Sequence, residues 1–325
     1  MTFVIFKHML FFIRLIFIFF LFLLSFCAPF IAYINHIPSN STNVIDVEKG
    51  ESIDRVLSRI SNHNFINKIF IRIFIKNNNI SSIQTGEYLI KDKSIKDIII
   101  SMQNGDTVTY EIRINEGINI YQLEELINNS FMINDCSYLQ CLDKKYPFYE
   151  GTLFPDTYFY KKNTKSSVIL SQSRTKLVSF LDNLFTNEYS KSNLTKNEVL
   201  ILASIIEKEA GNDSEKAIIS SVFLKRLDLG MKLQADPTII YGLFPNFDGD
   251  IKKSDILDSN NKFNTYMIKG LPPTPISISS PSSIEAAANS SPGEYLFFVA
   301  DSPSSHYFSK TYDEHKKKVN ELNLK

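Results

Sequence analysis

An uninterrupted apolar run near the N-terminus constrains this chain more than any other feature of its sequence. No Asp, Glu, Lys or Arg occurs from Leu15 to Ile45, and residues 15–34 read LIFIFFLFLLSFCAPFIAYI. About 20 such residues in a helix cross a hydrocarbon core of about 30 Å. We therefore expect a single N-terminal transmembrane helix over residues 15–34, with the rest of the chain folded outside the lipid.

The charges that flank this run predict its orientation. Lys7 and Arg14 precede it, whereas the near downstream flank contains only His36 before Asp46. Because positively charged residues stay on the cytoplasmic side, residues 1–14 are expected to be a short cytoplasmic N-terminus and the body to be extracytoplasmic.

Two other interpretations of the run are a cleaved signal peptide and a lipoprotein signal. The run is longer than the 7 to 15 residues of a signal-peptide core. Phe26 precedes Cys27, at a position where a lipoprotein signal has a small residue. An uncleaved anchor is the interpretation we prefer.

Charge and cysteine content exclude several classes of protein. Lys and Arg number 35 and Asp and Glu number 35, so the basic excess of a nucleic-acid-binding protein is missing. Three cysteines are too few for a disulfide framework. Cys27 lies in the apolar run, which leaves Cys136 and Cys141 as a possible pair, and the sequence does not decide whether they form a disulfide.

A metal site is not indicated by the histidines. His306 and His315 lack the clustered acids or cysteines that would complete a set of metal ligands. We expect neither a metal nor a cofactor.

The remainder reads as an α+β chain in two parts. Residues 35–46 are polar and rich in turn formers, which is typical of a tether. Residues 47–106 alternate capped helices with short strands and predict a small αβ module, although residues 65–75 fit a strand and a helix equally well. Residues 107–325 form the larger part, in which residues 168–190 predict a long helix and residues 294–301 a buried strand.

Two helices that meet at a sharp corner are predicted in the larger part. Thr195 and Glu198 form a capping box at the start of the first helix, and Gly211 is expected to close that helix in a left-handed turn. The second helix is expected to start at Asn212, with Glu215 completing another capping box.

Glu209 stands at an unusual position on the first of these helices. On a wheel of 100° per residue it falls between Leu202 and Ile205, inside the apolar stripe, whereas Glu207 points to the other side. Burial and a place in the last helical turn both raise the pKa of a carboxyl group, as a general acid requires. A buried structural acid with a neighbouring partner is the alternative, and the wheel alone favours it slightly.

Polar clusters downstream could line a sugar site. Gln234 and Asp236 lie in one turn before an apolar run, and Asn264 and Thr265 precede a second bend. Amide, carboxylate and hydroxyl groups bind sugar hydroxyls, but the same residues are also ordinary turn and cap formers. The residues alone leave both interpretations open.

Five long segments of the larger part stand out, in this order: EGTLFPDTY at 150–158, LASIIEKEA at 202–210, SVFLKRLDLGMKLQADPTIIYGL at 221–243, FNTYMIKGLPP at 263–273 and YLFFVADSPSSHYFSKTYDEH at 295–315. Together they resemble one family, the endolytic murein transglycosylases (the MltG or YceG-like family). The resemblance covers nearly the whole chain, and the small N-terminal part is similar to a LysM-like glycan-binding module.

The resemblance implies a lytic transglycosylase of the bacterial plasma membrane that cuts nascent peptidoglycan strands internally and leaves 1,6-anhydro-N-acetylmuramic acid ends. It implies a LysM-like module over residues 47–106 and a catalytic domain over residues 107–325, with Glu209 as the catalytic acid. Gln234 and Asp236, and more weakly Asn264 and Thr265, become substrate-binding candidates. Peptidoglycan strands are the implied partner, and peptidoglycan synthases are a further partner class.

Two competing functions stay open from sequence. The chain could be a peptidoglycan-binding scaffold with an inactive catalytic domain, although Glu209 is intact. It could also be a muramidase-type hydrolase that uses water.

Overall fold

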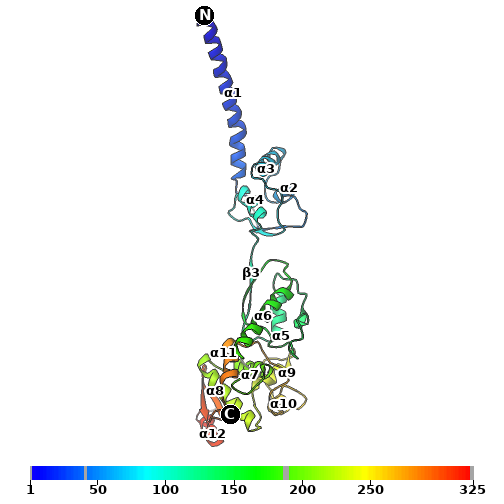
Figure 1. The fold of residues 1–325 in the computed structure, drawn as a ribbon, viewed down its shortest axis with the longest axis vertical. Coiled ribbons are helices and arrows are strands. Elements are labelled where there is room, and N and C mark those ends of the chain that lie inside the picture. The colour runs from blue at the N-terminus through cyan, green and yellow to red at the C-terminus, as the bar shows by residue number, and fades with distance from the viewer. Residues whose placement is uncertain (1, 40–41, 186–189, 323–325) are drawn as a thin grey trace. The chain divides into compact units, whose positions relative to one another are not determined.

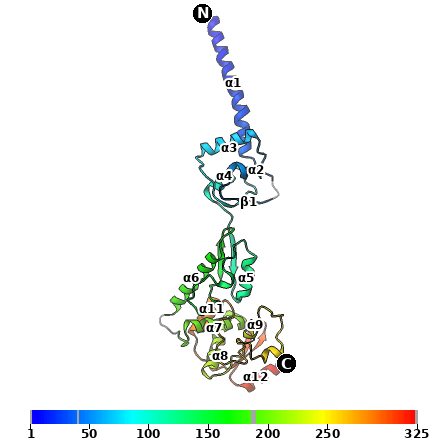
Figure 2. The ribbon, with the colours of Figure 1, turned by 90° about the vertical axis from the view of Figure 1, so that its right-hand side faces the viewer.

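The computed structural model describes residues 2–39, 42–185 and 190–322. The chain divides into two compact units, residues 1–110 and 111–325. Both are mixed α+β and mostly helical, and the sheets within the described residues have two strands each (Figures 1 and 2). The expected α+β class is therefore confirmed at this level.

The N-terminal unit begins with one long apolar helix, α1 (Thr2–Ile34). Its residues 7–34 are long and apolar enough to cross a membrane, and the most apolar 18-residue stretch among them is not buried within the protein. The end of the helix differs, because Ile34 is buried in the core of this unit. This confirms a helix over the predicted residues and is consistent with a membrane anchor or a signal sequence.

A small αβ arrangement follows α1. Strands β1 (Val44–Val47) and β2 (Gly86–Leu89) pair antiparallel, and helices α2 (Ile53–Ser58), α3 (Phe65–Asn77) and α4 (Ile95–Asn104) pack with them around one core.

The ambiguous segment in this unit is helical. Phe70, Ile71 and Phe74 of α3 are buried, and their spacing is that of one helix face. Gly105 ends α4 in the left-handed conformation with φ of 74°, as glycine permits.

Strand pairing and a disulfide organise the start of the C-terminal unit. Strand β3 (Tyr110–Ile114) pairs with β4 (Asp156–Tyr160), and helices α5 (Ile120–Asn128) and α6 (Ser166–Leu184) follow β3 and β4 respectively. The helix predicted for residues 168–190 is present but ends earlier than expected, at Leu184, because the chain is extended at Phe185; residues 186–189 lie outside the described residues.

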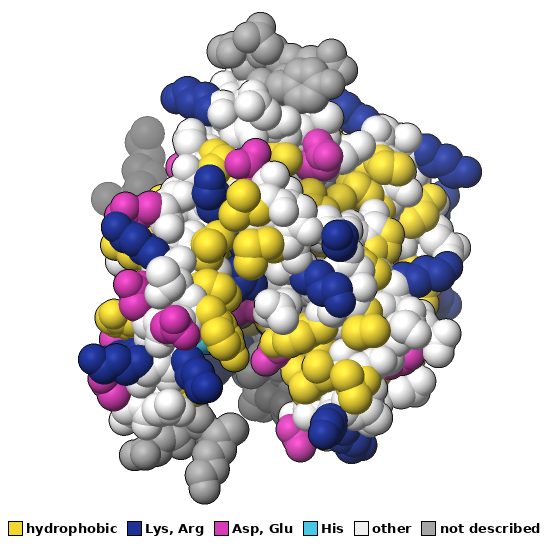
Figure 3. Space-filling view, turned by 90° about the horizontal axis from the view of Figure 1, so that it is seen from below, with side chains coloured by type: hydrophobic (Ala, Val, Ile, Leu, Met, Phe, Trp, Pro, Cys, Tyr) yellow, Lys and Arg dark blue, Asp and Glu magenta, His cyan; other side chains and the backbone are white. Residues whose placement is uncertain are grey.

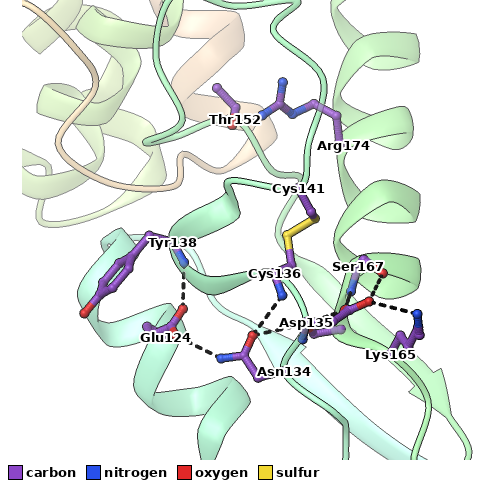
Figure 4. Close-up of a disulfide and its surroundings, with 11 residues drawn as sticks. Glu124, Asn134, Asp135, Cys136, Tyr138, Cys141, Thr152, Lys165, Ser167 and Arg174 are labelled. Carbon is purple, nitrogen blue, oxygen red and sulfur yellow. Dashed lines mark hydrogen bonds and ion pairs between the residues drawn. A yellow bond between two sulfur atoms is a disulfide. The ribbon is translucent and has the colours of Figure 1, made fainter.

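Cys136 and Cys141 form a disulfide in the loop between α5 and β4 (Figure 4). The loop is held on two sides. Glu124 of α5 accepts from the backbone N–H of Tyr138 at 2.8 Å, and Asp135 accepts from the backbone N–H of Ser167 on α6 at 2.9 Å. The pairing left open by the sequence is thus present.

Helix α7 (Lys196–Glu209) packs against α8 (Lys216–Asp228), α9 (Asp236–Leu243) and α11 (Pro281–Asn289) (Figure 1). A short helix α10 (Lys253–Ile256) precedes α11, and α12 (Tyr312–Glu321) ends the described chain. Every residue of α7 from Val199 to Ile206 is buried, so α7 is the central element of this unit's core.

The last two strands form a hairpin, β5 (Phe297–Ser302) with β6 (Ser305–Ser309). The prediction of a buried strand over residues 294–301 is wrong in its burial, because β5 has no strand neighbour other than β6 in the described chain and its residues are half-buried or exposed.

Candidate active site

Glu209 is the last residue of α7. The helix begins with the predicted capping box: Thr195 Oγ1 accepts from Glu198 N at 3.3 Å, and Glu198 Oε2 accepts from Thr195 N at 2.9 Å. It ends at Ala210, which is extended with φ of −69° and ψ of 126°. The buried run from Val199 to Ile206 fixes the axis of the helix, so the core positions the Glu209 carboxyl group at its edge.

The left-handed turn predicted at Gly211 does not form. The chain leaves the helix through the extended Ala210, and Gly211 is needed for a different reason. A Cβ atom at Gly211 would lie 2.8 Å from the backbone carbon and oxygen of Ser304, in the turn between β5 and β6. Glycine is therefore required by close approach of a distant backbone.

The second predicted capping box, between Asn212 and Glu215, does not form. Asn212 does cap the turn, accepting from Ser214 N at 2.9 Å. Glu215, however, accepts from the backbone N–H of His306 at 2.8 Å and contacts the His306 ring nitrogen Nδ1 at 2.8 Å. These contacts fasten the β5–β6 hairpin to the corner that follows Glu209.

The environment of Glu209 favours the protonated carboxyl group. Burial is the main cause that raises its pKa to about 8, the negative charge of Asp236 raises it further, and Arg226 acts in the opposite direction. The side chain is only partly exposed. Within the described part of the chain it forms neither a hydrogen bond nor an ion pair, which argues against the alternative of a partnered structural acid.

Arg226 is held away from Glu209 by other acceptors. Its Nε donates to the carbonyl oxygen of Leu296 at 2.8 Å, one terminal nitrogen donates to that of Leu233 at 2.6 Å, and the guanidinium lies 5.5 Å from the centre of the Phe297 ring. Arg226 thus lowers the pKa of Glu209 without forming an ion pair that would keep the carboxyl group deprotonated.

Asp236 begins α9 and is exposed. The hydroxyl of Tyr266 donates to Asp236 Oδ1 at 2.6 Å, and burial together with this bond raises the pKa of Tyr266. Gln234 is exposed and has φ of 52°, a left-handed conformation that is uncommon for glutamine. Glu209 and Tyr266 therefore both lie close enough to Asp236 for its charge to raise their pKa values. The side chain of Gln234, two residues before Asp236, is open to solvent.

Asn264 and Thr265 occupy a different kind of position, since both are fully buried. Asn264 donates to the carbonyl oxygens of Asp255, Ile256 and Asp258, each at 3.0 Å. Thr265 Oγ1 accepts from Ala235 N at 2.9 Å. The geometry favours a supporting role for these two candidates: they hold the 255–266 loop against the start of α9.

Glu207 faces away from Glu209, as the wheel predicted, and binds α11. Its Oε2 accepts from Ser280 N at 2.9 Å and from Ser283 Oγ at 2.6 Å, with Lys216 Nζ at 3.5 Å. Its side chain is 9% exposed. Glu207 therefore fixes the end of α7 to α11.

A second buried acid lies in the same unit. Glu150 is 4% exposed, accepts from the backbone N–H groups of Ile120 and Gly151 at 2.8 and 3.0 Å, and interacts with the Tyr241 hydroxyl. Burial raises its pKa to about 7. Because both oxygens already accept from the protein, the geometry favours a structural role for Glu150.

Tyr266 and Arg226 are two site residues that the sequence interpretation did not select. Arg226 had a signal: with Ile219, Val222 and Phe223 it shares a helix face whose members are all buried, the same reasoning that selected Glu209. Tyr266 follows Asn264 and Thr265 directly, but no local pattern connects it with Asp236.

Taken together, these residues offer a protonated carboxyl group at a partly open helix end, with a second carboxylate near by. Such a group can donate a proton to a leaving oxygen and afterwards accept one. Among the described residues there is no group of three or more His, Cys, Asp or Glu side chains that could hold a metal ion.

Comparison with known proteins defines the family. The model of the YceG-like family matches residues 45–321, and the chain therefore belongs to this family. A protein of Bacillus subtilis (strain 168) named endolytic murein transglycosylase is 28% identical over 306 residues, covering 86% of this chain and 84% of that protein.

Two further relatives agree. A protein of Streptococcus pneumoniae serotype 2 with the same name is 25% identical over 320 residues, which cover 85% of this chain and 58% of the longer relative. The crystal structure of a yceG-like protein from Listeria monocytogenes matches with a TM-score of 0.55 and 28% identity, covering 84% of this chain and 97% of that one.

Proposed function

We propose that this chain is a membrane-anchored lytic transglycosylase that cleaves the bond between N-acetylmuramic acid and N-acetylglucosamine within peptidoglycan strands and leaves 1,6-anhydro-N-acetylmuramic acid ends. The names of its relatives support the substrate class. The observation that carries the proposal is Glu209: a carboxyl group without a bonding partner among the described residues, with its pKa raised to about 8.

The proposed reaction uses one carboxyl group twice. Protonated Glu209 donates its proton to the glycosidic oxygen, and the bond from this oxygen to C1 of the muramic acid breaks with an oxocarbenium-like transition state. The Glu209 carboxylate then removes the proton of the C6 hydroxyl of the same sugar while that oxygen bonds to C1. The anhydro ring closes, Glu209 regains its proton, and no water is consumed.

Asp236 and Gln234 are the proposed substrate-binding groups. Both side chains are exposed beside the start of α9, where they can bind sugar hydroxyl or acetamido groups. Asp236 also helps to keep Glu209 protonated, because two nearby carboxyl groups resist simultaneous ionisation. Asn264 and Thr265 support this arrangement from the buried side.

The N-terminal unit is proposed to provide the anchor and a LysM-like glycan-binding module. α1 would span the bacterial plasma membrane with the body outside. A cavity of about 450 Å³ lies between the turn at residues 48–54 and the segment at residues 81–83. Ser52, Ser81 and Ser82 in its wall offer hydroxyl groups to a sugar, and peptidoglycan strands are the proposed ligand.

The test uses the full chain, reconstituted in lipid nanodiscs and incubated with uncrosslinked peptidoglycan strands whose new ends are identified by mass spectrometry. Wild type is expected to produce anhydro ends and Glu209→Gln to produce none. Glu285→Gln, the same change at an exposed position on α11, is the matched control and is expected to retain activity.

The competing functions predict other products. New reducing ends would indicate a muramidase-type hydrolase. Retained strand binding without cleavage by folded wild-type protein would indicate the scaffold.

A further inference from the structure

The start of helix α3 exposes large apolar side chains. Phe65 is 78% and Ile66 is 56% exposed, and both precede the buried face formed by Phe70, Ile71 and Phe74. Side by side at a helix end, they form an apolar tip that the described fold leaves uncovered. We call Phe65 and Ile66 the α3 tip.

α3 is fixed against the C-terminal part of α1. The Phe70 ring lies 5.5 Å from that of Phe26, 5.6 Å from that of Phe30 and 6.3 Å from that of Tyr33. The Tyr33 hydroxyl is also 3.3 Å from the Ser61 hydroxyl, just before α3. Ring contacts on one turn of α3 therefore connect it to three positions of α1.

These contacts set the depth of α3 if α1 spans a membrane. Phe26 precedes Ile34 by eight residues, which is about 12 Å of helix, and Ile34 ends the apolar run. A span of about 30 Å that ends near Ile34 places Phe26, Phe30 and Tyr33 in the outer part of the hydrocarbon and at its boundary with the headgroups. A helix that packs on these rings lies at the same level.

The charges on α3 suit this level. Lys68, Arg72 and Lys76 are exposed and follow one another at four-residue spacing, so they form a row along one side of the helix, and α3 contains no acidic residue. The apolar face with Phe70, Ile71 and Phe74 is buried, so the exposed side of α3 combines this row of cations with the α3 tip. Exposed Lys and Arg beside large apolar side chains bind the surface of membranes that contain anionic lipids.

We propose that α3 lies in the interface of the membrane that α1 spans, with the α3 tip among the acyl chains and the Lys68, Arg72 and Lys76 row at anionic headgroups. The partner is the lipid bilayer. α1 and the small module then form one membrane-bound platform. This inference rests on the proposed anchoring by α1.

The test exploits the absence of tryptophan from the chain, so that one introduced Trp reports a single position. Full-length Phe65→Trp is reconstituted in vesicles containing phosphatidylglycerol, with and without bromine on the acyl chains. Phe19→Trp, on the exposed surface of α1, tests the anchor. Phe159→Trp, at a position 65% exposed in the C-terminal unit, is the matched control for a Phe-to-Trp change in water.

We expect Phe65→Trp to emit at shorter wavelength than Phe159→Trp and to be quenched at least twofold by brominated lipid, as Phe19→Trp is. Quenching of Phe19→Trp with emission of Phe65→Trp like that of Phe159→Trp would overturn the inference and leave the anchor in place. If neither Phe19→Trp nor Phe65→Trp is quenched, both the anchoring by α1 and the placement of α3 at the membrane are overturned.

The charged row has its own measurement. Lys68→Gln, Arg72→Gln and Lys76→Gln, combined in the Phe65→Trp protein, are expected to weaken quenching in vesicles with phosphatidylglycerol and to have little effect in vesicles of phosphatidylcholine alone. Equal quenching of the two proteins in phosphatidylglycerol vesicles would overturn the role assigned to the cations.

Discussion

At Glu209 two charged neighbours act in opposite directions on a carboxyl group that burial already keeps protonated. Asp236 raises its pKa and Arg226 lowers it, while burial is the largest cause. Arg226 is occupied by the carbonyl oxygens of Leu233 and Leu296, which limits its influence. The balance leaves a proton available at neutral pH and lets the same oxygen become a base once that proton is given away.

Removal of the Asp236 charge tests this balance. In Asp236→Asn the pKa of Glu209 falls, so the decline of kcat/KM with rising pH, expected near pH 8 for wild type, moves to lower pH. The measurement is the pH profile of strand cleavage. Asp313→Asn, at an exposed position on α12, should leave the profile unchanged, and an unshifted profile for Asp236→Asn would contradict the assigned coupling.

Glu209 is also expected to destabilise the fold at alkaline pH. Its folded pKa of about 8 is above the ordinary value of 4.5 for Glu, so the cost of ionising it in the fold appears as pH rises through 4.5 and is complete above 8. Glu209→Gln should therefore match wild type in thermal stability only below about pH 4, where the carboxyl group is protonated in both the folded and the unfolded chain. At pH 9 it should gain about 1–3 kcal/mol, which is several degrees in the midpoint of thermal unfolding. A variant that is less stable than wild type at pH 9 would show that Glu209 has a stabilising partner.

At the scale of the elements, patterns within one helix could be predicted and contacts between distant segments could not. The capping box of Thr195 and Glu198 and the place of Glu209 follow from spacing along α7. The left-handed turn expected at Gly211 is replaced by an extended exit, because the backbone of Ser304 packs against Gly211.

The same limit applies to the polar candidates. An Asn and a Thr such as Asn264 and Thr265 can bind a sugar or hold a loop in place equally well. Only the fold shows that Asn264 donates to the carbonyl oxygens of its own loop and that Thr265 binds the backbone at the start of α9. Burial of Arg226 was accessible from its helix face, whereas its carbonyl partners come from other segments. Strand β5 is less buried than predicted because it pairs only with β6 among the described strands. No local sequence pattern indicates how many strands a strand will pair with.

The disulfide loop is expected to contribute to the stability of the C-terminal unit. Cys136 and Cys141 close a loop with a sequence separation of 5, for which loop-closure entropy gives about 2 kcal/mol. The double variant Cys136→Ser/Cys141→Ser should lower the free energy of unfolding of the C-terminal unit by about that amount. Urea denaturation measures the free energy of unfolding of the double variant and of the wild type, the latter under reducing and under non-reducing conditions. If neither the substitutions nor reduction lowers this free energy, the contacts of Glu124 and Asp135 alone hold the loop.

At the scale of the whole molecule, the two units divide the proposed work. The N-terminal unit contains the apolar α1 and the small αβ module, and the C-terminal unit contains Glu209 and its neighbours. Figure 3 shows a face on which Lys and Arg side chains are interspersed with Asp, Glu and hydrophobic ones. This face therefore differs from the basic surfaces that bind phosphate backbones.

The central claim is that Glu209 releases an anhydro end without consuming water, and the most direct measurement is cleavage in water enriched in oxygen-18. The full chain in nanodiscs is incubated with peptidoglycan strands, and the new ends are analysed by mass spectrometry. We expect wild type to produce 1,6-anhydro-N-acetylmuramic acid ends without oxygen-18, and Glu209→Gln to produce no such ends. Reducing ends that carry one oxygen-18 from the solvent would contradict it and establish hydrolysis.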